Sequence, residues 1–194
     1  VGCIDEDPVQ AQAFTRERKL AIAERSHELL TKKYGIKETD IIFDPLVFPC
    51  ATGDVNYIGG AVETIEGIRL IKQKFPNCRT TLGISNISFG LPSAAREVVN
   101  SVFLYHCTKA GLDTAIVNAE KLERFASIPE NERKLAEDLL FNFGRGDPMW
   151  SPGQAHGPAP TAPSHDLKFS STLHRSLVLP LPLQMIIRYD DEAH

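Results

Sequence analysis

The sequence lacks an apolar run approaching the roughly 20 residues that a membrane-spanning helix needs. It also lacks a cluster of lysine and arginine, and its net charge is -4, so a nucleic-acid-binding surface is not indicated. The first residues, Val1 to Asp5, contain neither the basic stretch nor the apolar stretch of a signal peptide. We therefore expect a cytoplasmic protein without a membrane or nucleic-acid partner.

Metal-binding patterns are also missing. The chain has four cysteines, but none forms a Cys-x-x-Cys pair and no histidine stands at a metal-ligand spacing from them: Cys3, Cys50, Cys78 and Cys107. Three histidines near the C-terminus, His156, His165 and His174, are unevenly spaced. We expect free thiols in a reducing compartment and no metal bound by this chain.

What the sequence does contain is a repeated strand-and-helix pattern. Short apolar runs end at four positions that lie 39, 41 and 33 residues apart: Ile4, Phe43, Ile84 and Val117. Helical patterns are expected at residues 10–34, 57–75, 93–110, 120–125 and 130–141. Repeated units of this length predict parallel strands joined by right-handed helical crossovers.

The number of units limits the fold. A (β/α)8 TIM barrel has eight such units in about 250 residues, whereas only four strands fit before Phe143. The pattern therefore predicts an α/β fold that is half a barrel or a small doubly wound sheet. Because Val1 already stands inside an apolar run, we favour the C-terminal half of a barrel, and expect a fragment whose N-terminal part is missing.

The C-terminal region has a different character. Seven of the thirteen prolines fall after Gly144, and neither a helical nor a strand period survives to Phe169. We expect two regions, a partial barrel at residues 1–143 and an irregular or disordered tail at 144–194. Residues 176–187 are apolar enough for one strand or an edge segment, although Pro180 and Pro182 argue against a central strand.

Polar side chains follow each expected strand. They are Asp5, Asp44, Asn86 with Ser88, and Asn118. The C-terminal ends of barrel strands form the ligand-binding face, and the small polar residues of 83–92 lie in a strand-to-helix connection where an α/β protein binds ligands. Planar carboxylate and amide groups match the amino-pyrimidinone edge of a flat heterocycle. No Ser-His-Asp order or phosphate loop is present.

Each of these residues also has a purely structural interpretation. Asp44 before Pro45 is typical of a turn, Asn118 is placed to cap the next helix, and Asp5 reads as a solvated loop charge. His106, in the middle of a helical pattern, is better explained as a packing residue than as a base. For Asn86, which lies between Ser85 and Ser88, we favour a functional role.

Five stretches of the sequence form a distinctive set in this order: residues 15–19 (TRERK), 40–45 (DIIFDP), 83–89 (GISNISF), 102–106 (VFLYH) and 111–119 (GLDTAIVNA). Together they resemble the pterin-binding (folate) module of cobalamin-dependent methionine synthase. The resemblance runs from Val1 to about Asn142, and the module is similar to dihydropteroate synthases and corrinoid-protein methyltransferases.

The resemblance implies a function. A full (β/α)8 barrel of this family binds 5-methyltetrahydrofolate at its C-terminal mouth. The N5 methyl group passes to the Co(I) form of cobalamin on a separate module, and then to homocysteine on another, in methionine biosynthesis. The expected partners are therefore the cobalamin-binding and homocysteine-binding modules of the same methyltransferase.

The resemblance also suggests roles for individual residues. Asp44 corresponds to the aspartate that grips the pterin's amino-pyrimidinone edge, and Asn86 to an asparagine near N5, which makes it the expected catalytic residue. Arg96 corresponds to a basic residue beside the ligand, and Asn118 to an asparagine at the end of the last strand. The expected substrate-binding set is Asp5, Asp44, Asn86, Ser88, Arg96 and Asn118.

The implied methyl transfer is physically sensible, and the absence of the first four βα units affects ligand binding. A tertiary amine leaves more readily if N5 is protonated, and the amide of Asn86 is suited to holding a proton delivered through water. In the family the first four βα units supply further pterin contacts. We therefore expect this chain alone to bind folate weakly or not at all.

Three alternatives stay open on the sequence. A stand-alone methyltetrahydrofolate:corrinoid methyltransferase would share the same motifs. A dihydropteroate synthase-like enzyme would need a lysine beside the third-strand motif, where Ile87 stands after Asn86. The chain could also be an inactive fragment that keeps the pattern without the catalytic function.

Overall fold

The computed structural model describes residues 1–141 and 185–188. The helices are α1 (Arg16–Glu28), continued by a π-helix (Leu29–Lys33), then α2 (Gly60–Lys74), α3 (Ser93–Lys109) and α4 (Glu130–Phe141). The strands are β1 (Ile42–Phe43), β2 (Arg79–Gly83), β3 (Thr114–Val117) and β4 (Met185–Arg188). No helix of this described part is both long and apolar enough to cross a membrane.

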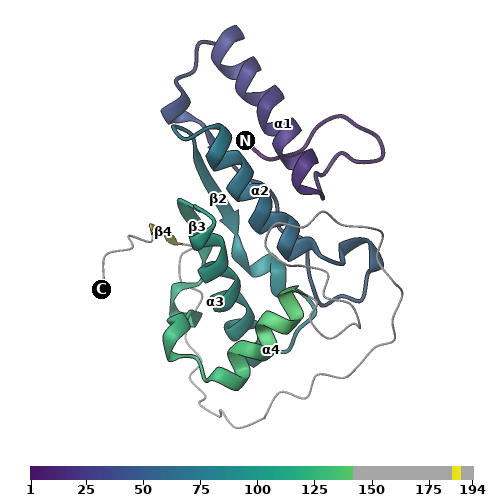
Figure 1. Ribbon diagram of the computed structural model, residues 1–194, viewed down its shortest axis with the longest axis vertical. Helices are drawn as coiled ribbons and strands as arrows, with labels where there is room; N and C mark the ends of the chain where they lie inside the picture. The colour runs from purple at the N-terminus through teal and green to yellow at the C-terminus, as the bar shows by residue number, and fades with distance from the viewer. Residues whose placement is uncertain (142–184, 189–194) are drawn as a thin grey trace.

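The strands form one sheet in the order β1-β2-β3-β4. The first three are parallel, with Phe43 opposite Thr80 and Leu82 opposite Ala115. Each strand therefore lies beside the next one in the sequence, and α1, α2 and α3 lie along one face of the sheet (Figure 1). A sheet that winds in one direction with its helices on one face is a segment of a barrel. Of the two folds that the sequence left open, the described residues therefore confirm the partial α/β barrel and not the doubly wound sheet.

β4 pairs antiparallel with β3 and lies at the sheet edge. It overlaps the segment, residues 176–187, for which the sequence predicted one strand or an edge segment. Residues 142–184 and 189–194 lie outside the described part. The proposed boundary at 143 and the remainder of the predicted irregular tail therefore stay predictions.

The first expected strand is shorter than predicted. In place of a strand at residues 1–4, Gly2 forms a single parallel bridge to Asp44. The N–H of Cys3 donates to the Asp44 carbonyl (2.9 Å), and the N–H of Asp44 donates to the Val1 carbonyl (2.8 Å). Pairing stops there because the chain folds back on itself, so that Ile4 bridges antiparallel to Gln12.

Two helix predictions also need correction. The first helix begins at Arg16 instead of residue 10, because residues 7–10 form a turn on the Asp7 carboxylate and Thr15 caps the helix by accepting from the Arg18 N–H. The helix expected at 120–125 is replaced by two short 3-10 turns, Ala119–Lys121 and Phe125–Ser127. Between them Leu122 is extended and packs against the core.

Alternate strand residues separate two faces of the sheet. Leu82 and Ala115 are buried beneath the helices, together with Thr80 and Val117. On the opposite face Ile42 and Ile116 keep 40% and 38% of their surface exposed. In a closed barrel this second face points to the interior, and the described residues cover it only partly.

A polar network closes the end of the sheet where β2 and β3 begin. The Asp113 carboxylate accepts from the Thr80 N–H (2.8 Å), the Thr80 hydroxyl (3.1 Å) and the Lys72 ammonium (3.0 Å). Lys72 also donates to the Cys78 carbonyl at 2.9 Å. Because Thr80 is fully buried, its N–H has no access to water as an alternative partner.

We expect Asp113→Ala to lower the free energy of unfolding by about 1–3 kcal/mol, because it leaves the buried Thr80 N–H without an acceptor. Urea unfolding of the purified chain measures the change. The control is Glu28→Ala, which breaks the exposed pair with Lys32 (2.8 Å) and is expected to lose no more than about 0.5 kcal/mol. Equal losses in the two variants would contradict the role of this network.

Candidate functional site

The loops that follow β1 and β2 contact each other and form one surface at the C-terminal edge of the sheet. Both the backbone N–H and the thiol of Cys50 donate to the Ile87 carbonyl, at 3.0 and 3.1 Å. Gly90 has a φ of 91°, and a Cβ there would lie 3.3 Å from the Ala51 carbonyl oxygen. These contacts join the loop that carries Asp44 to the loop that carries Asn86.

The two carboxylate oxygens of Asp44 differ in their hydrogen bonding. Its Oδ1 accepts from the Leu46 N–H at 2.9 Å, which confirms the predicted turn. Leu46 has a φ of 64°, in the left-handed region that residues other than glycine seldom adopt. No residue of the described ranges donates a hydrogen bond to Asp44 Oδ2. The half-buried carboxylate therefore keeps one oxygen for a ligand.

Asn86 is the exposed residue of a 3-10 turn, Ile84–Ser88. The turn is held against the core because Ile84 and Ile87 are fully buried there. The backbone carbonyl of Asn86 accepts from the Phe89 N–H at 3.3 Å. Its side-chain amide makes no hydrogen bond to the residues that the structure describes, so it is available to a bound molecule.

Ser88 and Arg96 form one unit. The Ser88 hydroxyl is fully buried, donates to the Ser85 carbonyl (3.1 Å) and accepts from Arg96 Nε (3.1 Å). Arg96 Nη2 also reaches the Ser85 carbonyl (3.4 Å), and the guanidinium lies 5.5 Å from the ring centroid of Phe89. Ser88 is therefore placed to orient Arg96, and its own hydroxyl has no exposed surface.

Asn118 lies on a neighbouring pocket. This pocket, of about 200 Å³, lies between the first turns of α3 and the segment after β3, and its polar lining includes Ser85, Arg96, Asn100, Asn118 and Lys121. The Asn118 side chain accepts from the Glu120 N–H at 3.2 Å, which confirms the predicted cap. Arg96 and Asn118 are brought together here, whereas Asp44 and Asn86 do not line this pocket.

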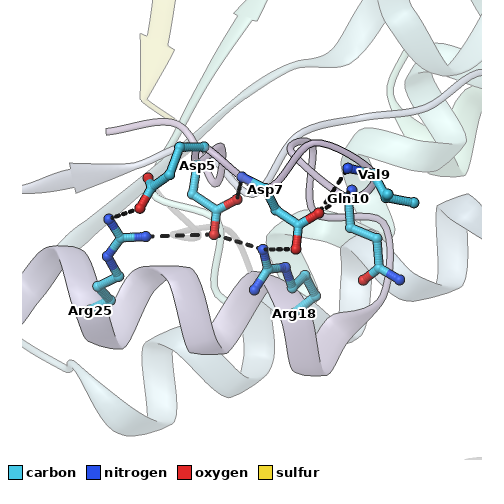
Figure 2. A network of polar contacts seen from close by, with 7 residues as sticks. Asp5, Asp7, Val9, Gln10, Arg18 and Arg25 are labelled. Atoms are coloured by element: carbon cyan, nitrogen blue, oxygen red, sulfur yellow. Dashed lines mark hydrogen bonds and ion pairs between the residues drawn. The ribbon is translucent and has the colours of Figure 1, made fainter.

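The Asp5 side chain belongs to an ion-pair network with α1 (Figure 2). Its Oδ2 lies 2.7 Å from Arg18 Nη2 and 3.7 Å from Arg25 Nη1. Its Oδ1 accepts from the Asp7 N–H at 3.1 Å. Only 9% of this side chain is exposed, so Asp5 is an anchor of the loop at residues 5–12 instead of a solvated loop charge.

His106 is a packing residue, as the sequence indicated. Its Nε2 lies 3.0 Å from Glu137 Oε1 on α4, and its ring stands edge-on to Phe141 with centroids 4.9 Å apart. Within residues 1–141 no three His, Cys, Asp or Glu side chains gather as a metal site requires. All four cysteines are free thiols, and burial raises the pKa of Cys3 and of Cys50 to about 12.

One residue next to the site was missed from the sequence. Lys19 is fully buried, and its Nζ donates to the carbonyls of Ala13 (2.9 Å) and Pro45 (2.6 Å). A signal was available, since Lys19 shares the inner face of α1 with Ile22 and Ala23, three and four positions later. A lysine in line with the apolar face of a helix indicates that its ammonium group is buried.

The comparisons with known proteins place these observations in a family. The sequence profile described as "Pterin binding enzyme" matches residues 4–118, a range that includes Asp5, Asp44, Asn86 and Asn118. The chain belongs to the pterin-binding enzyme family. The matched range therefore contains the strand ends that carry the candidate residues.

Two relatives are methionine synthases. The chain is 47% identical over 144 residues to methionine synthase of Mycobacterium tuberculosis, and 46% identical over 142 residues to that of Mycobacterium leprae. The matches cover 74% and 73% of this chain. They span only 12% of the length of either relative, so each relative has other parts that this chain does not match.

We expect Gly90→Ala to loosen the junction between the two loops. The new Cβ meets the Ala51 carbonyl oxygen at 3.3 Å and also carries the strain of a left-handed residue, about 1–3 kcal/mol. The matched control is Gly53→Ala, where φ is 78° but nothing lies within 4 Å of the Cβ. Urea unfolding should show the larger loss for Gly90→Ala, with faster amide exchange at Cys50. Identical losses would contradict the close packing of the loops.

Proposed function

We propose that this chain is the pterin-binding part of a methionine synthase. It would bind 5-methyltetrahydrofolate and present the N5 methyl group for transfer to cob(I)alamin and then to homocysteine. The observation that carries the proposal is that Asp44 and Asn86 each keep a polar group without a hydrogen-bond partner among the described residues. They lie on two loops joined by Cys50 and Ile87, in a family member that is similar to methionine synthases.

Asp44 is assigned to hold the pterin ring. The amino-pyrimidinone edge of a pterin presents N–H donors in one plane, and a carboxylate offers coplanar acceptors. Oδ1 is oriented by the Leu46 N–H and still has lone-pair capacity, while Oδ2 has no donor among the described residues. A ring fixed in this way keeps the N5 methyl in one orientation, which is a contribution of positioning to the reaction.

Asn86 is assigned to the reacting nitrogen. As the methyl group departs, its bond to N5 breaks with the electron pair left on nitrogen, and a proton delivered through water takes that position. The amide oxygen of Asn86 is a dipole suited to hold that proton donor and to stabilise positive charge at N5. Its exposed position on the 3-10 turn leaves the amide accessible to a ligand and to water.

The remaining residues are assigned to the rim. Arg96 would lie beside the ligand with its guanidinium oriented by Ser88, so that Ser88 acts through Arg96. Asn118 contributes from the end of β3 while it caps the following turn. Asp5, whose carboxylate is paired with Arg18, would shape the mouth through the loop that it anchors.

Cobalamin would come from another module. When bound there, it supplies the cobalt(I) nucleophile that accepts the methyl group. The residues of this chain would hold the pterin, orient the methyl group and manage the proton at N5. The homocysteine-binding module would be a second partner in the same enzyme.

A dihydropteroate synthase-like function is less well supported. Such an enzyme would use a lysine within the motif after β2 to meet a pyrophosphate-bearing substrate. The residue after Asn86 is Ile87, which is fully buried. A stand-alone corrinoid methyltransferase remains the closer alternative, and it would use the same residues with cobalamin on a separate protein.

Binding of 5-methyltetrahydrofolate to the purified 194-residue chain tests how complete the site is. We expect titration calorimetry to detect no binding at micromolar ligand, because the second face of the sheet is only partly covered and the family uses further barrel strands for pterin contacts. Weak binding should appear by NMR at millimolar ligand. Micromolar affinity in the calorimeter would overturn the expectation that the site is incomplete.

The role of Asn86 is tested in a chimera. Residues 1–141 replace the matching segment of the Mycobacterium tuberculosis methionine synthase, and methyl transfer from 5-methyltetrahydrofolate to cob(I)alamin is followed. We expect Asn86→Ala to reduce the rate by about 10²-fold, the usual effect of losing one stabilising group. The control, Asn77→Ala, removes an asparagine at the opposite end of β2, which bonds only to Glu38 in the described structure. A full rate with Asn86→Ala would refute the assignment.

A further inference from the structure

The buried Lys19 is the most unusual polar group next to the site. No part of its surface is exposed, and no carboxylate of the described residues lies within ion-pair distance of its ammonium. It donates to three carbonyls instead: Ala13 at 2.9 Å, Pro45 at 2.6 Å and Leu46 at 3.4 Å. Its Nζ also lies 5.1 Å from the centroid of the Phe48 ring. A lysine is retained in such a place only when all its donors are satisfied.

Two of the three carbonyls belong to the residues that follow Asp44. The N–H of Leu46 donates to Asp44 Oδ1, so the position of Leu46 determines how the carboxylate is held. Leu46 has a left-handed backbone, which persists only where its surroundings hold it. Thr64 on α2 also donates to the Leu46 carbonyl at 3.0 Å. Lys19 and Thr64 therefore hold the turn from α1 and α2.

We propose that Lys19 is a positioning residue, whose buried ammonium holds the Asp44–Leu46 turn in the conformation that presents Asp44 to the pterin. This inference rests on the proposed function for the identity of the ligand. The shape of the turn itself is a property of the chain alone. The two can therefore be tested separately.

The space for Lys19 is provided by Gly67 on α2. A Cβ at Gly67 would lie 2.6 Å from Lys19 Cδ, a distance at which one of the two groups must move. Glycine inside a helix lowers helix stability by up to about 1 kcal/mol relative to alanine. Gly67 thus has a packing reason to be there, namely the passage of the lysine side chain to the turn.

Charge gives this contact a pH dependence. Burial lowers the pKa of Lys19 from 10.5 to about 8. The titratable groups that face it are Cys3, Asp44 and Glu63. Burial raises the pKa of the Cys3 thiol to about 12. Above about pH 8 the neutral amine has two N–H donors for three carbonyls, so the turn loses one hydrogen bond.

The experiment uses the full 194-residue chain and follows amide exchange by NMR in the wild type and in Lys19→Met. Methionine has a similar length but donates no hydrogen bond. We expect the Leu46 amide to exchange at least tenfold faster in Lys19→Met at pH 7, with the β2 amides changing less. In the wild type, Leu46 protection corrected for intrinsic exchange should fall through pH 8, and this step should be absent from the variant.

Two outcomes would overturn the proposal. One is unchanged Leu46 exchange in Lys19→Met, and the other is an equal change at Leu46 and at the β2 amides, which would mean a global loss of stability. The matched control is Lys33→Met, an exposed lysine whose contact is the ring of Tyr34. If Lys19→Met does not fold, Gly67→Ala serves instead, because it displaces the lysine side chain while keeping its charge.

A double-mutant cycle connects the turn to the ligand. Binding of millimolar 5-methyltetrahydrofolate is titrated by NMR in Lys19→Met, in Asp44→Asn and in the double variant. We expect Lys19→Met alone to weaken binding about fivefold or more, and to add less than twofold in the Asp44→Asn background. Full additivity would overturn the positioning role. A wild-type chain that binds no pterin at any concentration would agree with the incomplete site, and the Leu46 exchange would then decide the role of Lys19. The proposed function fails separately, if the chimera with residues 1–141 does not transfer the methyl group.

Discussion

Parallel pairing of β1, β2 and β3 is the constraint on which the rest of the structure depends. Parallel strands bring all their C-terminal ends to one edge of a sheet, and residues 33 to 37 positions apart in the chain become partners on neighbouring strands. The bridge from Gly2 to Asp44 adds the N-terminal segment to the same edge. Without this pairing, Asp44 and Asn86 would have no reason to lie on adjoining loops.

The two edges of the sheet use polar groups in opposite ways. At the edge where β2 and β3 begin, the oxygens of Asp113 are occupied by Thr80 and Lys72. At the other edge, Asp44 Oδ2 and the Asn86 amide have no hydrogen-bond partner among the described residues. A barrel generally places stability at the first edge and ligand chemistry at the second. The hydrogen bonds of this chain follow that division.

Much of this arrangement was predictable from the sequence. The spacing of apolar runs predicts parallel strands, and the polar residue after each run indicates which edge carries the candidate site. The strand at residues 1–4 was overestimated because apolar character does not reveal that the chain turns back at Asp5. The helix at 120–125 was overestimated because Leu122 is drawn to the core in an extended conformation, a tertiary effect that overrides local propensity.

The site residues were harder to predict than the fold, because their partners come from distant parts of the chain. The Ser88 hydroxyl accepts from Arg96 on α3, which follows it in the sequence, and the ion pairs of Asp5 depend on the register of Arg18 and Arg25 along α1. The contact of Lys19 with Pro45 joins residues 26 positions apart. No local pattern encodes which carbonyls a buried lysine will meet.

The structural and functional interpretations of a residue are not exclusive here. Asp44 makes its turn with one oxygen and keeps the other, so the turn is the means by which the carboxylate is oriented. Asn118 likewise caps a 3-10 turn and lines the pocket between α3 and the segment after β3. A ligand-binding carboxylate that was not fixed by its own backbone would lose rotamer freedom on binding, at an entropic cost to affinity. Under the proposed function, the restraint of Asp44 by Leu46, and by Lys19 behind it, would remove that cost before the ligand arrives.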